Sequence, residues 1–70
     1  MTYEIRQLIL DQTYNSVVIS DCMGKLDKTV IELKELKVDE SIINDLNEAI
    51  GHLNSAKENL KGAIECLKIT

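Results

Sequence analysis

Apolar residues in the C-terminal half recur at alternating intervals of three and four residues. The series comprises Ile43, Leu46, Ile50, Leu53, Lys57, Leu60, Ile64 and Leu67. This spacing places all members on one face of an α-helix and forms a heptad seam, along which two helices pack. We therefore expect a helix from about Glu40 to Leu67. Lys57, the only charged member, can fix the register of the packed helices, or its stem can lie along the seam with the amine in water.

Three small residues follow one edge of this seam. They are Ala49, Ala56 and Ala63, spaced seven residues apart. A helix face without bulky side chains lets a second backbone approach closely. We expect a close helix–helix contact along this edge, formed either with the N-terminal half of the chain or with a neighbouring subunit.

The segment before this helix has the features of a tight connection. Asp39 is suited to be an N-cap, because its carboxylate can accept hydrogen bonds from the free amides of the first turn. Val38 and Ile43 are placed to form a hydrophobic staple around it. Lys34 and Lys37 lie where a preceding helix would end, and cations are favoured at that end. The sequence predicts two antiparallel helices joined by a short turn.

The N-terminal segment, about Thr2 to Leu36, is less regular. One broad apolar face holds Ile5, Leu8, Ile9, Val18, Ile19, Cys22, Met23, Leu26, Val30, Leu33 and Leu36. Gln12, Asn15 and Ser16 interrupt it. Two interpretations follow: a short separate helix over about residues 2–10 followed by a longer one from about residue 14, or one continuous helix. Both give a single all-α domain over residues 1–70, an antiparallel helical hairpin.

A second apolar stripe lies on the opposite side of the same segment. It consists of Tyr3, Leu10, Tyr14 and Val17. A two-helix hairpin covers only one face of each helix, so this stripe would face water unless another chain covered it. We expect an intermolecular contact here and hence a homo-oligomeric bundle. The alternative is that the N-terminal segment folds back as a third helix and buries these residues.

Charge and composition narrow the function classes. The net charge is −4 and the single arginine, Arg6, belongs to no basic cluster, which disfavours DNA or RNA binding. No apolar run is long enough for a transmembrane helix, and no secretory signal pattern is evident, so we expect a cytoplasmic protein. Cys22 and Cys66 lack metal-ligand spacing and only one histidine is present, so no metal site or cofactor is expected.

The candidate catalytic side chains all have simpler interpretations. His52 pairs at most with Glu48 one turn earlier, which is an ordinary surface arrangement. Carboxylate pairs such as Glu32 with Glu35 lie on a helix surface, whereas acid–base hydrolysis needs two carboxylates across a cleft. Phosphate-binding and nucleophile motifs are absent. We expect a protein that is not an enzyme.

The pattern Leu46-x2-Ala49-x3-Leu53-x2-Ala56-x3-Leu60-x2-Ala63-Ile64 resembles the C-terminal hairpin helix of small phage anti-defence proteins. These include the anti-CBASS sponges, whose hairpins assemble into oligomers that sequester cyclic-nucleotide signals. The resemblance implies a ligand held between subunits by aromatic rings and cations, for which Tyr3, Arg6 and Tyr14 are the candidates. The apolar surfaces lead us to expect a homo-oligomeric module that binds or inhibits a partner protein. The resemblance implies the alternative, a cyclic-nucleotide sponge.

Overall fold

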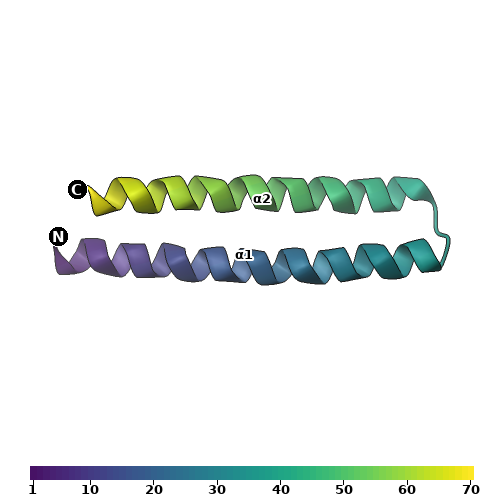
Figure 1. The fold of residues 1–70 in the computed structure, drawn as a ribbon, viewed down its shortest axis with the longest axis horizontal. Helices are drawn as coiled ribbons and strands as arrows, with labels where there is room; N and C mark the ends of the chain where they lie inside the picture. Colours follow the sequence, from purple (N-terminus) through teal and green to yellow (C-terminus); the bar gives the residue numbers. More distant parts are fainter.

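The chain forms two long α-helices that lie side by side and antiparallel (Figure 1). In the computed structural model, which describes residues 1–70, helix α1 spans Tyr3–Glu35 and helix α2 spans Glu40–Lys68. The chain termini lie together at one end, and the turn lies at the other. The Cα trace extends 53 × 14 × 10 Å, so the molecule is a rod only one helix thick in one direction. The predicted all-α helical hairpin is confirmed.

Helix α1 runs without a break through the polar residues in its N-terminal half, so the prediction of a short separate N-terminal helix is wrong. These side chains bond within the helix instead of ending it. The Thr13 hydroxyl donates to the Ile9 carbonyl at 2.8 Å, and the Asn15 amide donates to Gln12 at 3.0 Å. At the start of the helix, the Thr2 hydroxyl accepts from the Ile5 amide and caps the first turn.

The turn between the helices is a Schellman motif. The Val38 amide donates to the Leu33 carbonyl at 3.5 Å, and the Lys37 amide donates to the Lys34 carbonyl at 3.2 Å. Lys37 has φ 54°, the left-handed conformation that this motif requires and that glycine adopts most easily. Asp39 then caps α2 by accepting from the Ser41 amide at 2.9 Å. The predicted turn position and its Asp39 cap are confirmed.

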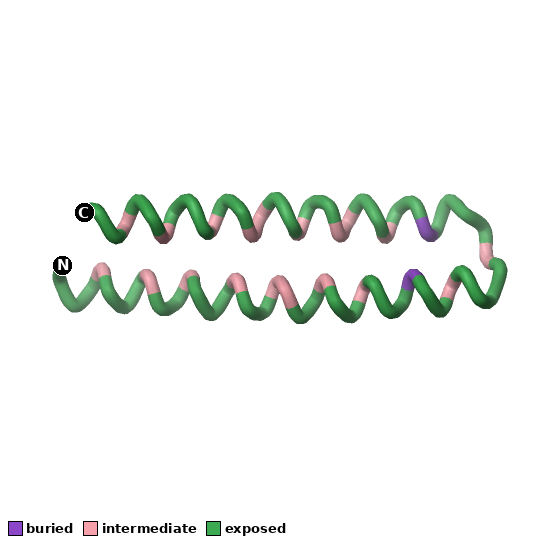
Figure 2. Tube along the Cα trace, viewed as in Figure 1, coloured by how far each residue is buried: buried purple, intermediate pink, exposed green.

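The seam predicted on α2 faces α1 along its whole length (Figure 2). All eight of its members are buried or half-buried. Helix α1 presents a matching series with the same alternating spacing, which consists of Ile5, Ile9, Gln12, Ser16, Ile19, Met23, Leu26, Val30 and Leu33. Val30 and Ile43, both near the turn, are the only two residues with less than a tenth of their surface exposed. The core is therefore one row of side chains from each helix.

The face of α1 that packs on α2 is narrower than the broad apolar face that the sequence predicted. Leu8, Val18, Cys22 and Leu36 are exposed, although they share that face in the sequence. A packed helix pair follows a repeat of 3.5 residues, which keeps a narrow row in contact and leaves these residues to one side. The row is completed by the polar Gln12 and Ser16, which the apolar pattern passed over.

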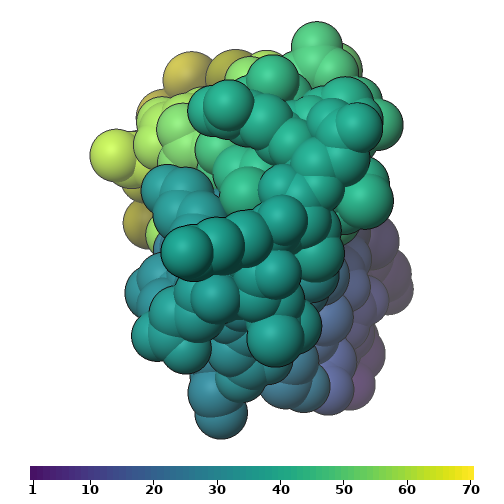
Figure 3. Space-filling model, turned by 90° about the vertical axis from the view of Figure 1, so that its right-hand side faces the viewer, coloured from purple at the N-terminus to yellow at the C-terminus, as the bar shows by residue number.

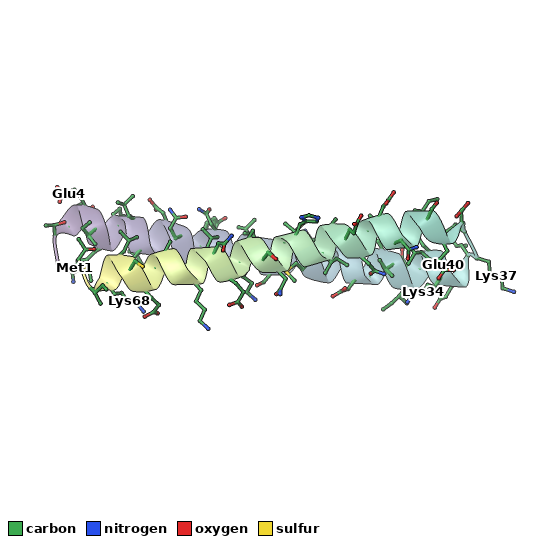
Figure 4. The ribbon with its side chains drawn as sticks, turned by 90° about the horizontal axis from the view of Figure 1, so that it is seen from above. Met1, Glu4, Lys34, Lys37, Glu40 and Lys68 are labelled. Carbon is green, nitrogen blue, oxygen red and sulfur yellow. The ribbon has the colours of Figure 1, made fainter.

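The two helices cross at a shallow angle, as Figure 4 shows from above. A shallow crossing is the geometry in which side chains of one helix fit between side chains of the other along a heptad seam. The chain has two helices and no third layer, and viewed from the turn the two helices lie one above the other (Figure 3). Each helix therefore has its outer side and both flanks free of any covering segment.

Candidate interaction surfaces

One long face of the hairpin is lined by the small-residue edge of α2 and is built from both helices. We call it the Ala face. Next to the seam it consists of Leu8, Asn15, Cys22, Thr29 and Leu36 from α1 and its end, and Ile42, Ala49, Ala56 and Ala63 from α2; farther out it includes Val18, Asn59 and Cys66 and is edged by Asp11, Lys25, Glu32, Asp45 and His52. Asn15 and Val18 line a shared groove with Ala56 and Asn59, which shows that these residues of the two helices lie on the same side. The seam residues Ile19 and Leu60 form the rest of that groove's lining.

The Ala face is incompletely covered within one chain. Ala49 and Ala56 are half-buried against α1, as expected for the small-residue edge, whereas Ala63 is exposed. Val18 keeps 48% of its surface exposed and Ile42 keeps 46%. A hairpin alone therefore leaves an apolar strip that runs along both helices.

The opposite flank, here the polar face, has a different composition. It consists of Arg6, Thr13, Ser20, Asp27 and Lys34 from α1, and Asn47, Asn54, Lys61 and Lys68 from α2. The half-buried seam residue Lys57 lies on this side, where it lines a groove with Thr13 and Ser16. The two flanks of the seam thus differ sharply, and only one of them is apolar.

A third surface, the outer stripe, contains the predicted interface residues of α1. Tyr3, Leu10, Tyr14 and Val17 are between 60% and 72% exposed. Ile31, fourteen residues after Val17, lies on the same side of α1 and is 59% exposed, but Gly24 occupies the position between them. Because α1 does not fold back on itself, no part of the chain covers this stripe.

The proposed ligand residues do not form one site within a chain. Tyr3 and Tyr14 are eleven residues apart on a continuous helix, or about 16 Å along its axis, so one base cannot stack on both. Arg6 instead lines a shallow hollow with Met1, Ile9, Leu10 and Lys68 at the open end of the hairpin. Figure 4 shows Met1 and Lys68 together at this end.

Charged and reactive groups do not assemble into a centre elsewhere. The two ion pairs, Lys25 with Asp21 and Lys68 with Glu65, each lie within one helix and are exposed. No group of three histidine, cysteine or acidic side chains is placed to hold a metal ion. Hydrogen bonds from Ser41, the backbone amide first, lower the pKa of Asp39, which is a capping effect.

Neither helix carries a stretch that is both long and apolar enough to cross a membrane. Comparison with protein-family models, with curated proteins and with solved structures gave no match. The surfaces of the hairpin itself are therefore the basis for proposing its function.

Proposed function

We propose that this chain is a homo-oligomeric helical interaction module that binds or inhibits a partner protein and has no catalytic role. The observation that supports this is the amount of surface that the single hairpin leaves in water. Its accessible area is 5304 Å². A compact monomer of 7.9 kDa exposes about 4400 Å² by the usual scaling of area with mass.

The excess of roughly 900 Å² is close to the share that one partner buries in a standard protein–protein interface, about 800 Å². Much of the exposed surface is apolar and arranged in rows, as on the Ala face and the outer stripe. Contiguous apolar surface of this kind marks contact sites on small soluble domains. Association with a second chain would bring the area of each hairpin into the range of a compact protein.

The outer stripe has the composition of a surface that recognises another protein. It carries both tyrosines of the chain. Tyrosine is enriched in interfaces because a large, stiff ring contributes contact area while its hydroxyl can still form a hydrogen bond. We propose that this stripe, in particular Tyr3, Leu10, Tyr14 and Val17, contacts the partner.

The experiment for self-association is light scattering coupled to size exclusion, over a dilution series. An oligomer whose mass falls toward 7.9 kDa on dilution supports the proposal, and a strict monomer at every concentration overturns it. Tyr14→Ala then tests the stripe. If it abolishes activity toward the partner but leaves the oligomer mass unchanged, Tyr14 contacts the partner; a loss of both assigns Tyr14 to packing between copies.

A cyclic-nucleotide sponge is the second candidate function. The hollow at the open end favours it, because two cations, Arg6 and Lys68, lie beside the apolar Leu10 there. Cationic side chains next to an apolar wall can hold a phosphate and a base together. Calorimetric titration with cyclic di- and trinucleotides tests this function. Heat that is lost in Arg6→Ala supports the sponge, and the absence of heat with all ligands excludes it.

A further inference from the structure

We propose that the second copy of this chain packs on the Ala face, antiparallel to the first, and that the outer stripe stays on the outside of the resulting four-helix dimer. This inference rests on the proposed self-association and adds which face carries it. The occupant is a second copy because the area that a single hairpin leaves in excess matches one subunit's share of a standard dimer interface.

The Ala face is the only apolar surface to which both helices contribute. A second hairpin on it would extend the existing core, since the groove there already reaches the seam residues Ile19 and Leu60. The polar face carries only polar or charged side chains along both helices, so a second hairpin packed there would not extend the apolar core. The outer stripe lies on α1 alone, so a hairpin docked there would meet one helix.

The middle of the Ala face suits contact with an identical surface. In a two-fold dimer, residues near the axis meet their own copies, so a charge placed there would face a like charge. The central residues that line the groove or adjoin it, Asn15, Val18, Cys22, Ala56 and Asn59, are uncharged, and the nearest charge on this side of α1, Lys25, is paired with Asp21. By contrast, Asp21 and Lys28 adjoin the middle of the outer stripe. Electrostatics therefore favour the Ala face for self-contact.

The sizes of the side chains set the orientation. On α2 the Ala face presents the large Ile42 at the turn end and the small Ala63 toward the open end, whereas α1 presents Leu8 near the open end and Leu36 at the turn end. In an antiparallel two-fold copy α2 packs on α2, which places Ile42 of one hairpin near Ala63 and Cys66 of the other and fills space without clashes. In a parallel two-fold copy α2 would pack on α1, which brings Ile42 of one hairpin against Leu36 of the other, two large residues at the same end.

Two neighbouring valines give a matched test of the face. Val17 lies on the outer stripe and Val18 on the Ala face, and they are 62% and 48% exposed. A glutamate at either position adds the same charge to the same helix. Val18→Glu should weaken the dimer more than about 100-fold, because two like charges meet near the axis. Val17→Glu should change the dissociation constant less than about threefold.

Light scattering and circular dichroism on both variants give the outcome. A Val18→Glu monomer that keeps wild-type helix content, beside a dimeric Val17→Glu, supports the inference. The reverse pattern assigns self-association to the outer stripe and overturns the inference. Two variants that both remain dimeric overturn the inference as well. A wild-type monomer would instead refute the proposed function, so the two failures are distinguishable. If Val18→Glu loses its helix content, the cross-linking measurement below decides.

The two cysteines, both exposed and on the Ala face, report the orientation without added probes. Cys22 lies three residues from Ile19, the middle of α1, so in an antiparallel dimer the two copies of Cys22 lie within about 9 Å along the axis. Cys66 lies twelve residues from Asn54, the middle of α2, which separates its copies by about 36 Å.

A short bifunctional maleimide should therefore link Cys66→Ser, which keeps Cys22, into a covalent dimer, and should leave Cys22→Ser as a monomer on a denaturing gel. Efficient linkage in both variants indicates a parallel dimer and overturns the antiparallel orientation. If neither variant is linked while the wild type is still dimeric in solution, the Ala face is not the dimer interface. Tyrosine emission gives an independent check, because both tyrosines lie on the outer stripe and their emission should not change as the dimer is diluted.

Discussion

Replacing Lys57 with isoleucine should stabilise the protein, and the size of the effect follows from its position. Lys57 occupies the seam position between Ile50 and Ile64, seven residues from each, and like them it is half-buried. It forms no ion pair across the seam, where its groove is lined by Thr13 and Ser16. Isoleucine would complete a row of identical residues on this side of the seam.

Full burial of an isoleucine contributes about 1.5–3 kcal/mol, so a half-buried site gives roughly 1 kcal/mol. The apolar stem of lysine already recovers part of this, and isoleucine forms helix less well by a few tenths of a kcal/mol. The net gain for Lys57→Ile is about 0.5–1 kcal/mol, which raises Tm by about 2–8 °C for a domain of this size.

Thermal unfolding followed by far-ultraviolet circular dichroism measures this shift, at one protein concentration because the stability of an oligomer depends on concentration. Lys61→Ile is the matched control, since Lys61 is exposed on the polar face and its replacement should change stability by less than about 0.5 kcal/mol. A Tm for Lys57→Ile that is unchanged or lower than wild type would refute the reasoning, because it would mean that the lysine is paired or required in the seam.

Three further predictions concern the backbone and the caps. Lys37→Gly should raise stability by about 1 kcal/mol in chemical denaturation, because Lys37 has a positive φ of 54° that costs glycine nothing; a destabilised variant would contradict this. Gly51→Ala should raise Tm through a gain of up to about 1 kcal/mol, since a methyl group there meets no atom within 4 Å; a loss of stability would indicate a chain packed on that side. Asp39 has a lowered pKa, so its cap stabilises the fold at neutral pH and that stabilisation is lost as the pH falls below about 4; Asp39→Asn should lessen this acid sensitivity, and an unchanged pH profile would argue against it.

The features of the fold that could be predicted from the sequence are those set by short-range chemistry. The spacing from Ile43 to Leu67 predicted the face of α2 that packs, and the Asp39 cap predicted where that helix begins. Both depend on residues whose roles are decided within a few turns of helix. The left-handed conformation of Lys37 was not predicted, because the residue usual at that position is glycine.

The course of α1 could not be predicted in the same way. Gln12 and Ser16 left open whether the helix breaks or continues; they occupy seam positions, since a hairpin can tolerate polar residues in a seam that is only half-buried. Cys22 was expected on the broad apolar face of the N-terminal segment, and it lies exposed on the Ala face beside the seam. Several apolar rows on α1 could pack on α2. Which of them is buried depends on how the two helices are aligned, and contacts between residues far apart in the sequence decide that alignment.

The central claim is that this hairpin associates with another copy of itself, and its mass in solution tests that claim most directly. Light scattering on the wild-type chain at micromolar concentration should give about twice 7.9 kDa, falling toward 7.9 kDa on dilution. A mass of 7.9 kDa at every concentration would contradict the claim, because the exposed Ala face would then have no second copy to cover it.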